Sequence, residues 1–169
     1  SAERIIDLIE TKVDIYDTDE VKAIYGTFLS PKRENWEPLE GYVEFRNVTF
    51  KYPGAEKAAI ENLSFVAKPG ETTAIIGGTG MGKSTIVNLI PRLYDVTEGQ
   101  VLVDDVDVRD YDTEVLRKKI GFVPQKAVLF AGTIDSNIAF GDENATEERI
   151  EEAVKIAQSY DFVMKKPDG

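Results

Sequence analysis

The feature that most constrains this chain is a glycine-rich run that ends in lysine and a hydroxyl residue. The run reads Gly77-Gly78-Thr79-Gly80-Met81-Gly82-Lys83-Ser84-Thr85, which fits the pattern of a glycine, four residues and then Gly-Lys-Ser/Thr. A short apolar segment, 72–76, precedes it, and apolar residues at helical spacing follow it over 86–93. We therefore expect a strand, a glycine loop and a helix in direct succession. Pro91 should kink or end that helix because proline lacks an amide hydrogen.

This loop has the chemistry of a phosphate-binding site. Glycines adopt positive φ angles and let backbone amides and the N-terminus of the next helix approach an anion closely. Lys83 adds a positive charge for outer phosphates, and Ser84 supplies a small hydroxyl for magnesium. A glycine-rich turn that only caps a helix does not explain why Lys and Ser follow at these positions.

Composition limits what else the chain can be. Its 169 residues are 42% hydrophobic and 30% charged, as in globular proteins, and no apolar run approaches the ~20 residues that a membrane span needs. A net charge of −11 disfavours nucleic acid as a partner. The sequence has no cysteine and no histidine, so it offers neither a thiol nucleophile nor the commonest metal ligand.

The rest of the pattern predicts a domain that starts near Gly41. Residues 1–11 suit a short amphipathic helix whose apolar stripe needs a partner, and the acidic residues 13–40 are typical of a linker. Alternation then predicts an antiparallel layer from residues 42–46, 48–52 and 59–67, and a strand pair over 100–108 that turns near Asp104-Asp105. Further segments are expected to be a strand at 120–124 and helices at 113–119, 133–140 and 146–160.

Several short tracts stand around the loop in a fixed order. They are Phe50-Lys51-Tyr52-Pro53-Gly54, Tyr94-Asp95-Val96-Thr97-Glu98-Gly99, Leu116-Arg117, Val123-Pro124-Gln125 and Leu129-Phe130-Ala131-Gly132-Thr133-Ile134. Together they resemble the nucleotide-binding domain of ABC transporters of the exporter type, from Gly41 to the end of the chain. The resemblance implies an α/β fold with a P-loop NTPase core and an antiparallel β subdomain, incomplete at its C-terminal side. It also implies that the chain binds MgATP in an exporter whose ATP hydrolysis drives transport across a membrane.

The resemblance assigns roles to residues and implies partners. Tyr52 stands where the family stacks an aromatic ring on adenine, and Gln125 where a glutamine contacts magnesium and the attacking water. The implied nucleotide-binding residues are Tyr52, Gly77, Gly78, Thr79, Gly80, Met81, Gly82, Lys83, Ser84 and Thr85, with Lys83 and Gln125 catalytic and Ser84 and Gln125 at the metal. Residues 1–40 would tether the domain, 41–169, to the transmembrane domain of the same exporter, at the cytoplasmic face of the cell membrane. A second nucleotide-binding domain, identical or different, is the other implied protein partner.

The chain also departs from the family pattern. Gly78 and Met81 replace residues that are more often proline or serine and a small residue, and Lys126 stands where many members are acidic. The Leu-Ser-Gly-Gly-Gln signature, the apolar strand that ends in Asp-Glu, and the switch histidine are absent from the sequence. Residues 97–100 and 101–105 imitate the first two in the wrong place, so we expect them to be hairpin residues. We expect this chain alone to bind nucleotide without hydrolysing it.

Two other functions stay open. A nucleotide-binding interaction module that never hydrolyses ATP would carry the same loop. A small-molecule kinase would also need an acceptor site and a lid, which the sequence does not show.

Overall fold

The computed structural model describes residues 15–27, 30–32, 40–142 and 144–166. The chain divides into two compact units, 1–122 and 123–169, and each is described by itself. The helix predicted at residues 1–11 lies outside the described residues, and the domain start near Gly41 stays a prediction.

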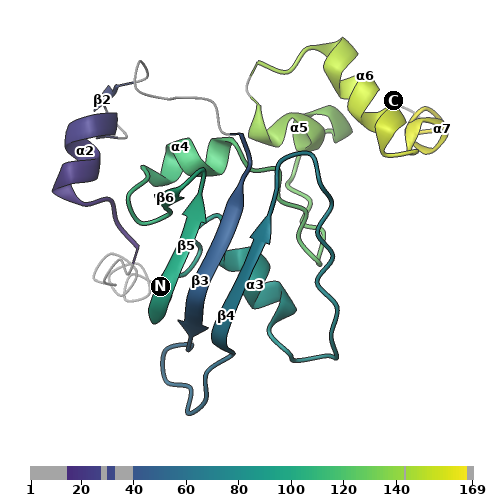
Figure 1. Cartoon of the computed structure of the whole chain (residues 1–169). Helices are drawn as coiled ribbons and strands as arrows, with labels where there is room; N and C mark the ends of the chain where they lie inside the picture. The colour runs from purple at the N-terminus through teal and green to yellow at the C-terminus, as the bar shows by residue number, and fades with distance from the viewer. Residues whose placement is uncertain (1–14, 28–29, 33–39, 143, 167–169) are drawn as a thin grey trace, which may run out of the picture. The chain divides into compact units, whose positions relative to one another are not determined.

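The first unit is built on a four-stranded antiparallel sheet in the order β4-β3-β5-β6 (Figure 1). Its strands are β3 (Val43–Phe50), β4 (Ile60–Ala67), β5 (Glu98–Val103) and β6 (Val106–Asp107). The two alternating runs predicted at 42–46 and 48–52 form one strand, since the register shifts around Asn47, whose φ is 49°. Such a bulge resets the alternation, so that Phe45, Val48 and Phe50 are all buried in the core.

The bulge explains why the second residue of β5, Gly99, is a glycine. A Cβ at Gly99 would lie 2.4 Å from the carbonyl oxygens of both Arg46 and Asn47, and the φ of Gly99 is +80°. No side chain fits there without moving the backbone of β3.

The predicted hairpin at Asp104-Asp105 is confirmed. Both residues have positive φ, 48° and 64°, as in the two-residue turns that join tightly paired strands. The Asp104 carboxylate accepts three backbone N–H groups, from Glu40 (2.8 Å), Gly41 (3.0 Å) and Tyr42 (2.8 Å). Asp104 therefore holds residues 40–42, which lead into β3, against the hairpin.

Two short helices pack on the sheet. Ile86 and Leu89 of α3 (Lys83–Leu89) and Leu116 of α4 (Thr113–Lys118) share one buried cluster with the strand residues. As predicted, α3 stops before Pro91, and its last cap is Ile90. Asp112 caps α4, because its carboxylate accepts the amides of Glu114 and Val115.

The acidic segment predicted as a linker contains regular structure. It holds α2 (Asp19–Tyr25), capped by the Thr18 side chain, and a hairpin of β1 (Gly26–Thr27) and β2 (Ser30–Pro31). The prediction missed α2 because the helix is seven residues long and buries only Val21, so it shows no helical stripe of apolar residues.

The strands predicted at 72–76 and 120–124 are wrong for this structure. Neither segment is a strand, and Ile76 and Val123 are each 94% exposed. A strand of this apolar kind needs a hydrogen-bonded neighbour on each side, and no strand in the described ranges pairs with either segment.

The second unit is helical. It contains α5 (Ile134–Ile138), the 3-10 turn η2 (Ala139–Gly141), α6 (Glu147–Ile156) and α7 (Tyr160–Val163). The predicted start of α6 at Thr146 is confirmed, since the Thr146 side chain accepts the amide of Arg149. Among the described residues, every helix is too short or too polar to cross a lipid bilayer.

Candidate functional site

The glycine run forms a loop that leads directly into α3. Gly80 and Gly82 have φ angles of 81° and 78°, and Gly82 is the N-cap of the helix. A Cβ at Gly82 would lie 2.6 Å from the carbonyl oxygen of Ala59, at the edge of β4. Gly82 has no side chain to act as a cap, and within the described part of the chain no side chain caps the first amides of α3. Those amides are available to an anion.

The Lys83 side chain folds back onto the backbone of the glycine loop. Its Nζ donates to the carbonyl oxygens of Gly77 at 2.7 Å and Gly78 at 2.5 Å. Ser84 comes next and is exposed, and within the described residues its hydroxyl bonds to no other residue. The first two residues of α3 therefore supply an ammonium and a hydroxyl.

The unusual Met81 does not fill the loop. Met81 is 71% exposed, and its Sδ would lie 3.7 Å from a Cβ built on Gly78, an ordinary contact distance. Gly78 and Met81, which both depart from the family pattern, are therefore neighbours in space. The Met81 side chain lies next to Gly78, which has no side chain of its own.

Tyr52 lies beside the phosphate loop. It follows β3, and its hydroxyl is 3.0 Å from Oγ1 of Thr85, which is buried. The Tyr52 ring meets Phe50 and Tyr94 edge to face, at centroid distances of 4.7 and 5.3 Å. The sequence predicted Tyr52 and Thr85 as separate site residues, and the structure brings them together.

Tyr94 is the residue that the sequence reasoning missed. Tyr94 begins the tract 94–99, which contributes to the family resemblance. No alternation or helical spacing predicts a contact between Tyr94 and Tyr52, which lies 42 positions earlier. Tyr94 is 38% exposed, and its ring packs against the Tyr52 ring edge to face. Edge-to-face pairs of this kind hold a ring in a fixed orientation.

Gln125 lies in the second unit and is exposed. The structure does not place it relative to the loop, so its contact with magnesium beside Ser84 stays a prediction. Across the described ranges, no group of three or more His, Cys, Asp or Glu side chains gathers as a metal site. Asp104 follows an apolar run, as the magnesium-binding aspartate of the family does. Its carboxylate instead accepts hydrogen bonds from three backbone amides.

The residues of the loop fit a nucleotide polyphosphate with magnesium. The uncapped amides of α3 and the Lys83 ammonium offer hydrogen-bond donors and positive charge to an anion. The exposed Ser84 hydroxyl is of the oxygen class that magnesium takes alongside phosphate oxygens.

Comparison with known proteins identifies the family of the chain. A family model described as ABC transporter matches residues 60–168, more than half of the chain. The chain is 49% identical over 131 residues to the Bacillus subtilis protein named "Uncharacterized ABC transporter ATP-binding protein YfiB", covering 78% of this chain and 23% of that protein. It is 45% identical over 131 residues to an "ATP-dependent lipid A-core flippase" of Methylobacillus flagellatus, covering 77% and 22%.

The fold is also that of a solved exporter. The structure titled "Structure of a bacterial Atm1-family ABC exporter with ATP bound" matches with a TM-score of 0.82 and 32% identity, over 99% of this chain and 27% of the other. The chain spans about a quarter of the length of the relatives it matches. From its sequence match and its fold, the chain belongs to the ABC transporter family.

Proposed function

We propose that the chain binds MgATP at residues 77–85 as the nucleotide-binding part of an ABC exporter. The observation that carries the proposal is the bridge from the Lys83 ammonium to the carbonyl oxygens of Gly77 and Gly78, beside the uncapped start of α3. An anion at this point would meet the ammonium and the first amides of the helix together.

Each of the other site residues has a role in this proposal. Ser84 offers its hydroxyl to magnesium, which neutralises phosphate charge when bound. Tyr52 offers a ring face to adenine, held by Thr85, Phe50 and Tyr94. Gln125 is assigned to magnesium and the attacking water by the resemblance alone.

The whole exporter supplies what this chain does not contain. We infer that the parent couples ATP hydrolysis to export, with a transmembrane domain and a second nucleotide-binding domain, at the cytoplasmic face of the membrane. The matched flippase and exporter support this class of activity. In the parent, the signature peptide and the carboxylate that polarises water complete the catalytic site.

A competition titration tests the proposal. A fluorescent ATP analogue is bound to the chain and displaced by ATP or by AMP, each with magnesium. ATP should displace it at much lower concentration than AMP, because Lys83 and the helix amides act on the outer phosphates. Equal displacement by the two nucleotides would contradict a phosphate-led site.

A further inference from the structure

Beyond the loop, the structure contains a buried arginine just after α3. The Arg92 side chain is 5% exposed, and its φ is 51°, a left-handed conformation that is uncommon outside glycine. Its guanidinium donates two hydrogen bonds to the Asp95 carboxylate, from Nε at 2.8 Å and from Nη2 at 3.2 Å. Its carbonyl oxygen accepts Nη2 of Arg117 at 2.6 Å. Such a conformation persists only where the surroundings hold it.

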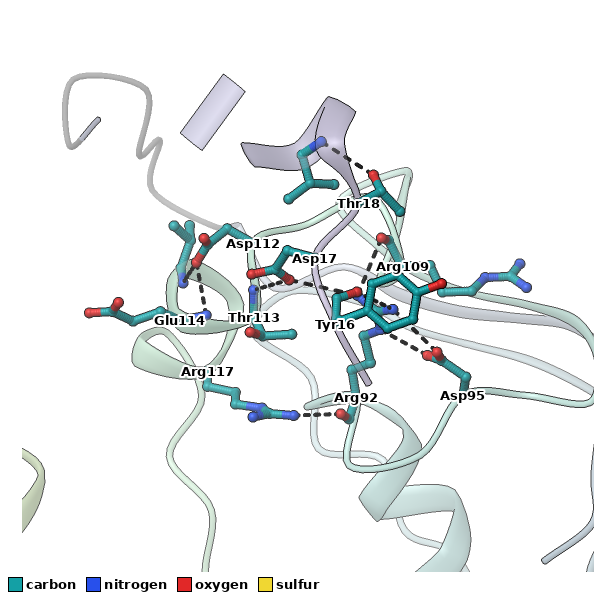
Figure 2. Close-up of polar contacts among 12 residues, drawn as sticks. Tyr16, Asp17, Thr18, Arg92, Asp95, Arg109, Asp112, Thr113, Glu114 and Arg117 are labelled. Atoms are coloured by element: carbon teal, nitrogen blue, oxygen red, sulfur yellow. Dashed lines mark hydrogen bonds and ion pairs between the residues drawn. The ribbon is translucent and has the colours of Figure 1, made fainter. Parts of the chain in front are cut away.

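The same guanidinium reaches a segment that is distant in sequence. Nη2 donates to the carbonyl oxygen of Tyr16 at 3.3 Å, and Nη1 lies 3.9 Å from Oδ1 of Asp17 (Figure 2). The residues Ile15–Thr18, which we call the N-terminal strap, lead directly into α2. Arg92 therefore holds the strap through one backbone contact and one ion pair.

Asp17 also completes the start of α4. Its Oδ1 accepts the backbone amide of Thr113 at 3.2 Å, across 96 residues of sequence (Figure 2). The Asp112 cap accepts the next two amides, those of Glu114 and Val115. The first amides of a helix lack hydrogen-bond acceptors within the helix. Asp17 therefore supplies an acceptor for the Thr113 amide, to which the Asp112 side chain does not bond.

These contacts join the strap to the helix that begins at the phosphate loop. α3 starts at Lys83, and Arg92 follows its last residue by three positions. We propose that Asp17 and Arg92 form a latch that couples occupation of the phosphate loop to the docking of the N-terminal strap. Asp17 acts as a positioning residue, since it works through Arg92 and α3. The nucleotide half of this proposal rests on the proposed function.

Linkage gives the coupling a measurable form. If phosphate bound in the loop reduces the motion of α3, it also reduces the motion of Arg92. The strap then binds more tightly to Arg92 and to the start of α4. By reciprocity, a strap that cannot dock must weaken nucleotide binding by the same factor. The mechanism needs only the contacts described here and no further partner.

Amide hydrogen exchange without nucleotide tests the latch itself. In Asp17→Ala the Thr113 amide loses its acceptor and should exchange at least several-fold faster, whereas Glu20→Ala should leave it unchanged. Glu20 is an exposed acid three positions further along the chain, so the control removes the same charge from the same region. Asp17→Asn keeps an acceptor and should give an intermediate rate. Equal Thr113 exchange in the unaltered chain and in Asp17→Ala would overturn the latch.

Exchange and titration with MgATP test the coupling. MgATP should slow Thr113 exchange in the unaltered chain and in Glu20→Ala, but not in Asp17→Ala, whose Kd for MgATP should rise by about 5-fold or more. A purely structural role for Asp17 would change exchange by the same factor with and without MgATP, and that result would overturn the coupling alone. If the unaltered chain binds no MgATP, both the coupling and the proposed function are wrong, whereas the nucleotide-free exchange still decides whether the latch exists.

Discussion

At the scale of single residues, the adenine part of the site depends on Tyr52. Its role as a stacking partner was assigned from its position in the sequence alone. The structure adds a physical setting, since Tyr52 contacts both the buried Thr85 hydroxyl and the exposed ring of Tyr94. A ring fixed in this way loses little freedom when a flat base stacks on it. The setting also allows a rival interpretation, in which Tyr52 only packs beside the loop.

Three substitutions of Tyr52 separate the two interpretations. Tyr52→Ala should weaken MgATP binding by about 1–3 kcal/mol, the usual size of one base–aromatic stack. Tyr52→Trp should keep or strengthen binding, and Tyr52→Phe should keep it, because only the hydroxyl contact to Thr85 is lost. Titration of each variant with MgATP measures this, and equal losses in the Ala and Trp variants would point to packing.

At the scale of elements, the sequence predicted best where a pattern was local. Alternation identified β4 and the two halves of β3 on either side of its bulge, and the side-chain cap at Thr146 identified the start of α6. The bulge at Asn47 escaped prediction because it depends on the approach of Gly99 from another strand. The segments 72–76 and 120–124 were predicted as strands from apolar content, but a strand also requires neighbours, which no local pattern reveals. The contact of Tyr52 with Thr85 is likewise a product of the fold.

The hairpin offers a matched pair of aspartates. Asp104 and Asp105 share the left-handed conformation, but only Asp104 accepts three backbone amides. Asp104→Ala should therefore be less stable than Asp105→Ala by about 1–2 kcal/mol, measured by urea unfolding. Neither change should alter MgATP binding. A specific loss of MgATP binding in Asp104→Ala would mean that its carboxylate belongs to the metal site after all.

The carboxylate of Asp107 predicts how stability responds to acid. Burial raises its pKa, but hydrogen bonds from Arg109 and Gln100 outweigh burial and hold the pKa below its ordinary value of 3.8. A carboxylate with a lowered pKa contributes stability above its unfolded-state pKa and loses it as the pH falls through the folded-state pKa. Asp107→Asn should remove this part of the acid response, and Asp110→Asn, at an exposed site, should retain it. Identical unfolding curves for the two variants from pH 7 down to pH 2 would contradict this account.

At the scale of the whole molecule, the chain should bind nucleotide without turning it over. It carries the loop and Lys83 but no signature peptide and no histidine, and the one carboxylate that imitates a magnesium ligand most closely, Asp104, is engaged by backbone amides. Phosphate release from MgATP should match that of Lys83→Ala. Turnover above background that disappears in Lys83→Ala would contradict this, and Asp105 would then be the first residue to test.

The central claim is that residues 77–85 bind MgATP, and a thermal melt with and without MgATP tests it most directly. With a Kd of about 1 mM, 10 mM MgATP should stabilise the folded chain by about 1.4 kcal/mol. Lys68→Ala, which removes an exposed lysine from a turn, should show the same gain in melting temperature. Lys83→Ala should lose most of that gain while melting normally without nucleotide, because the hydrogen bonds of the Lys83 side chain to described residues all go to the loop, at Gly77 and Gly78. An equal response to MgATP in Lys83→Ala and the unaltered chain would contradict the claim.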